Sequence, residues 1–186
     1  MKVIVIVDMQ NDFIDGVLGS PEAKAVVPTM IERLKEYENE LPLVIFTKDT
    51  HETNYLETQE GKNLPYEHCI RGTDGWCINK EIASVVDHGN FMKLTEHNGR
   101  IEKPTFGSTW LAYKIQDILN TNALEEVVLM GVCTDICVIS NALLIKAINP
   151  EVKITVDASC CAGVSPTKHA AALEVMKSCQ INVINE

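Results

Sequence analysis

Cys137 lies at a point in the sequence where a thiol could act as a nucleophile. It follows the apolar run 127–130, which is typical of a buried strand, and it opens the apolar-periodic stretch 136–148, which predicts a helix. A cysteine at such a junction lies near the positive end of the helix dipole, which lowers the thiol pKa and favours the thiolate. Taken alone, such a cysteine is more often a small packing residue. Its position therefore raises the question of whether Cys137 attacks a substrate.

Other polar residues also follow predicted strands. Asp8 ends one β-branched run, and Asp49 and His51 follow a second run. In an open α/β sheet, ligands bind outside the carboxyl ends of the strands. We therefore expect these side chains to share one edge of the sheet with Cys137. Lys103 lies in a turn-rich segment, and spacing alone does not place it relative to the others.

The elements that must position these residues alternate along the chain. This order predicts an α/β fold with three layers, α/β/α, and a mainly parallel sheet of about six strands, in a single domain that spans 1–186. The polar stretch 50–80 is irregular, and a loop of this length is unusual in a compact domain unless it carries function. Strands are expected at 3–7, 41–47, 90–94, 127–130, 153–156 and 181–184, and helices at 22–37, 78–86, 109–119, 136–148 and 167–178.

Net charge and hydropathy disfavour several classes of binding partner. The formal net charge of -10 disfavours binding to nucleic acid or to an anionic membrane surface. No apolar run approaches the roughly 20 residues of a membrane span, and the N-terminus lacks the features of a signal peptide. These observations predict a cytoplasmic protein. The seven cysteines show no framework spacing and are expected to be mostly free thiols.

Five short stretches, taken together, resemble the isochorismatase-like cysteine hydrolases, and within them the nicotinamidase and pyrazinamidase group. Each stretch alone is short, but all five occur in the family order and span most of the chain. The resemblance implies the isochorismatase-like hydrolase fold. The matching stretches are Asp8–Phe13, Thr47–His51, Glu67–Cys69, Lys103–Ser108 and Gly131–Val138.

The resemblance implies a catalytic triad of Asp8, Lys103 and Cys137. A lysine ammonium favours the thiolate, and a carboxylate can take the thiol proton and pass it to leaving ammonia. The implied oxyanion hole consists of the backbone N–H groups of Cys133 and Cys137, with a cis peptide bond between Val132 and Cys133. Cys133 stands where alanine is usual in the family, which leaves a redox or regulatory role for this second thiol open.

The resemblance also implies one divalent metal ion in each chain. The implied ligands are Asp49, His51 and His68, with Glu60 as a further ligand in some members. Carboxylate and imidazole groups suit zinc, iron or manganese, and zinc is the first expectation. In the family this ion binds the pyridine nitrogen of the substrate rather than activating the attacking group.

These residues predict an amidohydrolase that converts nicotinamide to nicotinate and ammonia through a cysteine thioester. Phe13 and Trp76 are candidates for packing against the flat ring of the substrate. One alternative is a related cysteine amidohydrolase acting on another small amide, such as a carbamoyl or ureido compound. The other is a non-catalytic ligand-binding or thiol-redox protein on the same fold. Members of the family are often homo-oligomers, so the resemblance implies an oligomer here.

Overall fold

A parallel sheet of seven strands forms the centre of the computed structural model, which describes residues 1–94, 99–121 and 124–186. The strands run in the order β3-β2-β1-β5-β6-β7, and β4 pairs with β2 beyond the end of β3. All the pairings are parallel, as the alternating order of elements predicts. The strands are β1 Lys2–Val7, β2 Leu43–Asp49, β3 Met92–Lys93, β4 Arg100–Lys103, β5 Glu126–Val132, β6 Lys153–Ala162 and β7 Asn182–Ile184.

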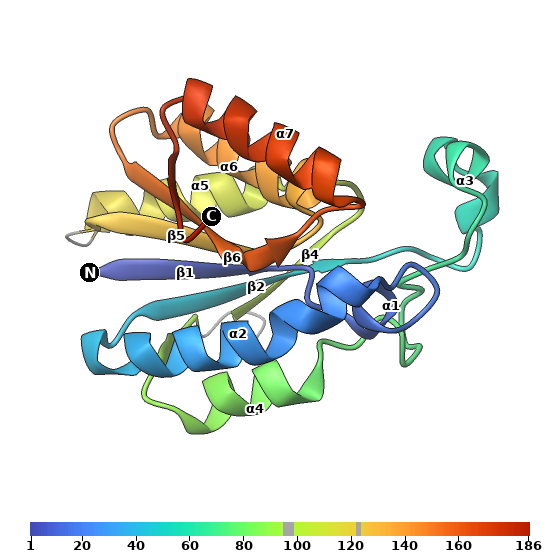
Figure 1. Cartoon of the computed structure of the whole chain (residues 1–186), viewed down its shortest axis with the longest axis horizontal. Coiled ribbons are helices and arrows are strands. Elements are labelled where there is room, and N and C mark those ends of the chain that lie inside the picture. Colours follow the sequence, from blue (N-terminus) through green and yellow to red (C-terminus); the bar gives the residue numbers. More distant parts are fainter. Residues whose placement is uncertain (95–98, 122–123) are drawn as a thin grey trace.

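Helices cover both faces of this sheet, which confirms the predicted three layers. Figure 1 shows α2 and α4 on one face and α5, α6 and α7 on the other. The serines before α2 and α7 cap these helices, since Ser20 accepts from the N–H of Ala23 and Ser165 accepts from that of Lys168. The helices are α1 Asn11–Ile14, α2 Pro21–Tyr37, α3 Gln59–Asn63, α4 Lys80–His88, α5 Thr109–Thr121, α6 Ile139–Ile148 and α7 Pro166–Ser178.

The central strand β1 shows why the chain forms two cores. Successive side chains of a strand point to opposite faces, so Val3, Val5 and Val7 pack under α5, α6 and α7. Ile4 and Ile6 point the other way and pack against α2 and α4. All five are fully buried, and complete burial of one such side chain contributes about 1.5–3 kcal/mol.

The register of the parallel strands brings the candidate residues to one edge. Val7 pairs with Gly131, and Asp49 pairs with Lys103, so β1, β2, β4 and β5 end close together. Gly131 has a φ of 134°, and a Cβ there would lie 2.1 Å from the carbonyl oxygen of Val7. Only glycine allows this close approach. Lys103 therefore ends a strand, which corrects its assignment to a turn.

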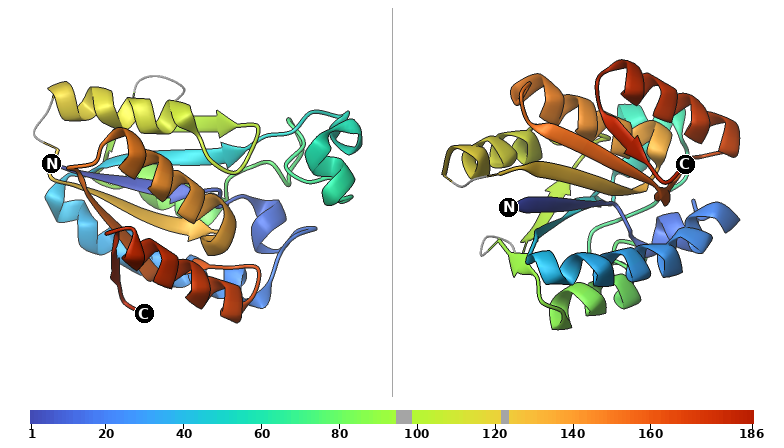
Figure 2. Two further views of the ribbon diagram at one scale, coloured as in Figure 1. Left: turned by 90° about the horizontal axis from the view of Figure 1, so that it is seen from above. Right: turned by 60° about the vertical axis from the view of Figure 1, so that its left-hand side comes forward.

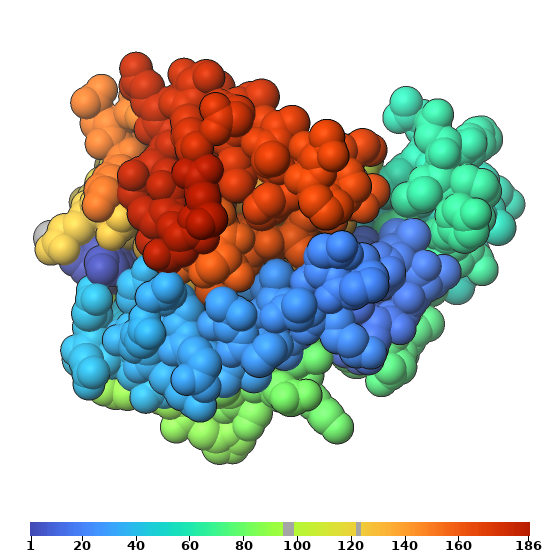
Figure 3. Space-filling model, viewed as in Figure 1, coloured from blue at the N-terminus to red at the C-terminus, as the bar shows by residue number. Residues whose placement is uncertain are grey.

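The stretch 50–80 is more regular than its sequence predicts. It contains a 3₁₀ turn at Tyr55–Glu57 and the short helix α3. The left view of Figure 2 places α3 beyond the carboxyl ends of the strands, and Figure 3 shows its segment projecting from the rest of the molecule. Among the described residues, no helix has the length and apolar content needed to cross a membrane.

Candidate active site

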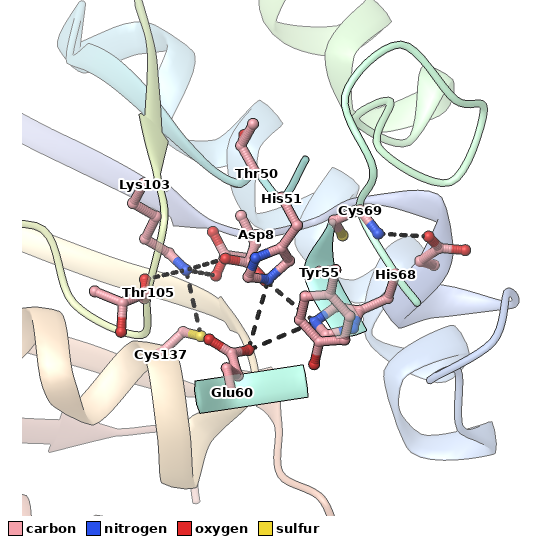
Figure 4. Close-up of polar contacts among 12 residues, drawn as sticks. Asp8, Thr50, His51, Tyr55, Glu60, His68, Cys69, Lys103, Thr105 and Cys137 are labelled. Atoms are coloured by element: carbon pink, nitrogen blue, oxygen red, sulfur yellow. Dashed lines mark hydrogen bonds and ion pairs between the residues drawn. The ribbon is translucent and has the colours of Figure 1, made fainter. Parts of the chain in front are cut away.

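Asp8, Lys103 and Cys137 meet at the carboxyl edge of the sheet. The Nζ atom of Lys103 lies 2.7 Å from Oδ2 of Asp8 and 3.5 Å from Sγ of Cys137. It also donates a hydrogen bond of 3.0 Å to the carbonyl oxygen of Thr105. All three side chains are buried, and Figure 4 shows Lys103 pointing toward both other groups. The structure thus places a carboxylate, a cation and a thiol in mutual contact.

Asp8 is held in a single orientation by Thr47 on the neighbouring strand. Its N–H donates to Oγ1 of Thr47 at 3.2 Å, and the Thr47 hydroxyl donates to Oδ1 of Asp8 at 2.7 Å. Asp8 has a φ of 49°, a left-handed conformation that is uncommon for residues other than glycine. The two hydrogen bonds leave Oδ2 directed at Lys103.

The electrostatics of this group correct the expectation of a lowered thiol pKa. Burial raises the pKa of Cys137 well above its ordinary value, and the Asp8 charge adds to this effect, while Lys103 opposes it. Burial also raises the pKa of Asp8 against the opposing effect of Lys103. Burial alone would lower the pKa of Lys103, but the Asp8, Cys137 and Asp49 charges raise it. Burial and the Asp8 charge thus oppose ionisation of the Cys137 thiol, and Lys103 favours it.

Cys137 lies in a π-helical turn, Thr134–Val138, that precedes α6. The carbonyl oxygen of Cys133 accepts from the N–H groups of Ile136 and Val138, both at 3.1 Å. The peptide bond between Val132 and Cys133 is cis, which confirms that prediction. The side chains of the turn are anchored as well, because the Thr134 hydroxyl contacts Nδ1 of His169 at 2.8 Å.

A second cluster of polar residues lies beside the thiol. Asp49, His51, Glu60 and His68 each offer one ligand atom, and these four atoms lie within 4.8 Å of one another. The Nε2 atoms of His51 and His68 are 3.0 Å and 3.4 Å from Oδ2 of Asp49. They are 3.5 Å and 3.9 Å from Oε1 of Glu60. Figure 4 shows His51, Glu60 and His68 converging from the segment after β2, from α3 and from the loop before α4.

The chemistry of this cluster fits a divalent metal ion. Nδ1 of His68 lies 2.8 Å from the carbonyl oxygen of Tyr66, to which it donates when Nε2 carries the lone pair. Two imidazoles and two carboxylates form a donor set that suits zinc, iron or manganese. Burial acts to raise the pKa of Asp49, but hydrogen bonds from His51 and His68 lower it, so its carboxylate is ionised.

Asp49 links the two clusters. Its Oδ1 lies 3.4 Å from Nζ of Lys103, while its Oδ2 faces the histidines. The side-chain amide of Gln10 fixes the backbone of Asp49, because Oε1 accepts from its N–H at 2.7 Å and Nε2 donates to its carbonyl oxygen at 2.9 Å. Movement of Asp49 would therefore disturb both groups at once.

A cavity of about 460 Å³ opens onto both clusters. Such a volume lies within the range of small-molecule sites. Phe13, predicted to contact the substrate, is part of the wall and lies edge-on to the ring of His68 at 5.6 Å between centroids. The lining includes Asp49, Glu60, His68, Cys133 and Cys137, together with the apolar residues Leu18, Leu64, Phe106, Ile136 and Val164.

Trp76, the other residue predicted to contact the substrate, is not among the residues that line this cavity. Its indole N–H donates to Oγ1 of Thr50 at 2.8 Å, and Nζ of Lys48 lies over its ring. Its carbonyl oxygen accepts a hydrogen bond of 2.9 Å from Gln10. Trp76 therefore holds the loop after His68 against β2, outside the lining of the cavity.

Several further residues shape the site without having been predicted from the sequence. Gln10 and Asp12 lie inside the first matching stretch, and Asp12 accepts from the N–H of Cys69 at 2.7 Å, next to His68. Phe106 also lies in a matching stretch, which was a usable signal. Tyr55 packs against both histidine rings, at 4.6 Å from His51 and 5.0 Å from His68 between centroids, and no local pattern indicates this contact.

The chain has a three-layer α/β fold with a buried cluster of Asp8, Lys103 and Cys137 at the carboxyl edge of its sheet. The Isochorismatase domain model matches residues 2–186, and the chain belongs to that family of hydrolases. This confirms the resemblance seen in the five stretches.

Several related proteins match nearly the whole length of this chain. An uncharacterised isochorismatase family protein of Bacillus subtilis is 27% identical over 175 residues, which cover 92% of each chain. The nicotinamidase/pyrazinamidase of Mycobacterium tuberculosis is 25% identical over 197 residues, covering 99% of this chain and 98% of that protein. The crystal structure of the Pyrococcus horikoshii pyrazinamidase in complex with zinc is 26% identical, with a TM-score of 0.75, and the match covers 100% of this chain and 99% of that one.

Proposed function

We propose that this protein is an amidohydrolase that converts nicotinamide to nicotinate and ammonia, with pyrazinamide as a second substrate. One observation carries the proposal: the buried contact of Asp8, Lys103 and Cys137 lies beside a four-residue ligand cluster at a single cavity. The names of the relatives, which include nicotinamidases and pyrazinamidases, support the same substrate class.

The first half of the reaction forms a thioester on Cys137. Asp8 takes the thiol proton, and the sulfur attacks the amide carbonyl carbon while Lys103 stabilises the negative charge on the sulfur. The carbonyl oxygen becomes an oxyanion, which accepts hydrogen bonds from the backbone N–H groups of Cys133 and Cys137. When the tetrahedral intermediate collapses, Asp8 returns the proton to the amide nitrogen, and ammonia leaves.

The second half releases the acid. Asp8 takes a proton from water, and the resulting hydroxide attacks the thioester carbonyl. Collapse of this second intermediate breaks the carbon–sulfur bond, and the proton on Asp8 returns to the sulfur of Cys137. Each of the three side chains is thereby restored to its resting state, and nicotinate is the product.

The ligand cluster orients the substrate in this proposal. A divalent ion held by Asp49, His51, Glu60 and His68 would act as a Lewis acid for the ring nitrogen, and the zinc complex of the Pyrococcus horikoshii relative makes zinc the first choice. Phe13 packs on the His68 side of the cavity, where its ring can contact a flat heterocycle. The amide is thus directed toward Cys137.

We expect His51→Ala to lose the bound metal. Removing one imidazole leaves three donors and also breaks the 3.0 Å contact that orients the Asp49 carboxylate. Elemental analysis of the purified protein should find close to one ion per chain in the wild type and a small fraction of that in the variant. His88→Ala is the matched control, because His88 is exposed on α4 and outside the cluster. Full metal retention by His51→Ala would exclude His51 as a ligand.

Ammonia release from a panel of amides tests the substrate assignment. We expect hydrolysis of nicotinamide and pyrazinamide, strong inhibition by a chelator, and a rate about 100-fold lower with benzamide, which is flat but lacks the ring nitrogen. Faster hydrolysis of a carbamoyl or ureido compound than of nicotinamide would contradict the assignment. Absence of ammonia release from every amide would favour a binding or redox protein instead.

A further inference from the structure

Asn141 is a buried polar residue of α6 that has no part in the mechanism above. It lies one helical turn after Cys137, and its side chain is fully inaccessible to solvent. Its Nδ2 donates to the carbonyl oxygens of Cys137 at 2.8 Å and of Phe106 at 3.3 Å. Its Oδ1 accepts from the N–H of Ser108 at 2.9 Å. One amide group therefore joins the nucleophile to the loop between β4 and α5.

That loop also carries a hydrogen-bond acceptor of the Lys103 ammonium. Lys103 donates to the carbonyl oxygen of Thr105, one residue before the Asn141 contact at Phe106. The loop lies directly on α6, since a Cβ at Gly107 would be 2.6 Å from a methyl group of Leu144. Phe106 itself lines the cavity. A shift of the loop relative to α6 would move the acceptor of Lys103 and one wall of the cavity together.

We propose that Asn141 is a positioning residue that holds the Lys103 loop and the Cys137 turn in one register, and so sets the distance between the ammonium and the thiol. The contribution of Asn141 to catalysis rests on the amide hydrolysis proposed above. Its effect on the reactivity of the Cys137 thiol does not depend on that reaction. An apolar residue of the same size removes the Asn141 side-chain partner of the Cys137 and Phe106 carbonyl oxygens and of the Ser108 N–H, which favours movement of the loop. Misplacement of reacting groups by about 1 Å can cost 100-fold in rate.

The test measures the reactivity of Cys137 separately from turnover. Iodoacetamide is added at one fixed pH, and alkylation of the peptide that carries Cys137 is followed by mass spectrometry. Asn141→Leu removes all three hydrogen bonds. Asn141→Thr is the second variant, because a threonine hydroxyl can still donate to the carbonyl oxygen four residues earlier but is too short to bond both sides of the loop. Thermal unfolding of each variant is recorded in parallel.

Asn149→Leu is the matched control. Asn149 is also a buried asparagine of this helix region, and its Nδ2 donates to the carbonyl oxygens of Ala112 at 3.2 Å and Ile145 at 3.4 Å. Its contacts resemble those of Asn141 but are made at the far end of α6. A purely structural loss should therefore affect both positions alike.

We expect both Asn141 variants to slow alkylation of Cys137 about tenfold and to lower kcat for amide hydrolysis about 100-fold. Asn149→Leu should alkylate at the wild-type rate, even where its melting temperature falls equally. Alkylation of the Asn141 variants at the rate of Asn149→Leu would overturn the proposal. If the wild type releases no ammonia but the alkylation difference persists, the proposed function fails and the positioning role of Asn141 stands.

Discussion

Cys137→Ser should lower the rate of amide hydrolysis by roughly four to six orders of magnitude. A serine hydroxyl is far harder to ionise than a thiol, and this position is buried beside the negative charge of Asp8. Ammonia release at saturating nicotinamide measures the effect. Metal content should stay at the wild-type level, because Cys137 is not part of the ligand cluster.

Cys77→Ser is the control for this substitution. Cys77 is an exposed free thiol whose sulfur makes only a weak contact of 3.6 Å with the carbonyl oxygen of Thr73. Its replacement should leave the rate unchanged and should remove a competing site from alkylation experiments. Wild-type ammonia release by Cys137→Ser would mean that another group performs the attack.

Asp8→Asn should lower kcat about 1000-fold, because the amide cannot accept the thiol proton or return it to the leaving nitrogen. The same change should destabilise the fold, since it removes the 2.7 Å partner of a buried ammonium. Loss of one member of a buried pair costs about 3–5 kcal/mol. We expect the lower end of this range, because Asp49 remains 3.4 Å from Lys103. Chemical denaturation measures this loss.

The double variant Asp8→Asn, Lys103→Met separates the two effects. Removing both charges takes away the uncompensated ammonium, so stability should recover relative to Asp8→Asn alone. Activity should not recover, because the base is still absent. Wild-type kcat in Asp8→Asn would contradict the role of Asp8 as the proton acceptor.

The sequence predicts the sheet edge well where hydrophobic runs are long. The β-branched run before Asp8 and the apolar run before Cys137 are both buried on two faces, so their ends are easily located. Parallel strands must end at one edge, and this places the side chains that follow them close together.

Lys103 shows where such prediction fails. Its strand, β4, contains Arg100, Ile101, Glu102 and Lys103, with a single apolar side chain among them. A strand of this composition carries no hydrophobic signal, and its place is set by pairing with β2, which is distant in the sequence. The contact of Lys103 with Asp8 therefore depends on tertiary structure.

Both the raised pKa of Cys137 and the burial of Asn141 result from tertiary packing, which the sequence does not show. The helix dipole is a local effect that sequence position reveals, but burial and the Asp8 charge, which raise the pKa of Cys137, depend on the packed site. Asn141 occurs in a helical sequence pattern, where a polar residue is ordinarily expected at the surface. Only the packing of the loop shows that its amide is buried and that both its oxygen and its nitrogen form hydrogen bonds.

Direct detection of the thioester tests the central claim of this account, that Cys137 is the covalent nucleophile. Wild-type protein is mixed with nicotinamide, quenched in acid during turnover and digested for peptide mass spectrometry. We expect a nicotinoyl group on the peptide that carries Cys137 and on no other cysteine-containing peptide. Continued ammonia release without an acyl group on Cys137, or with the group on another residue, would contradict the account.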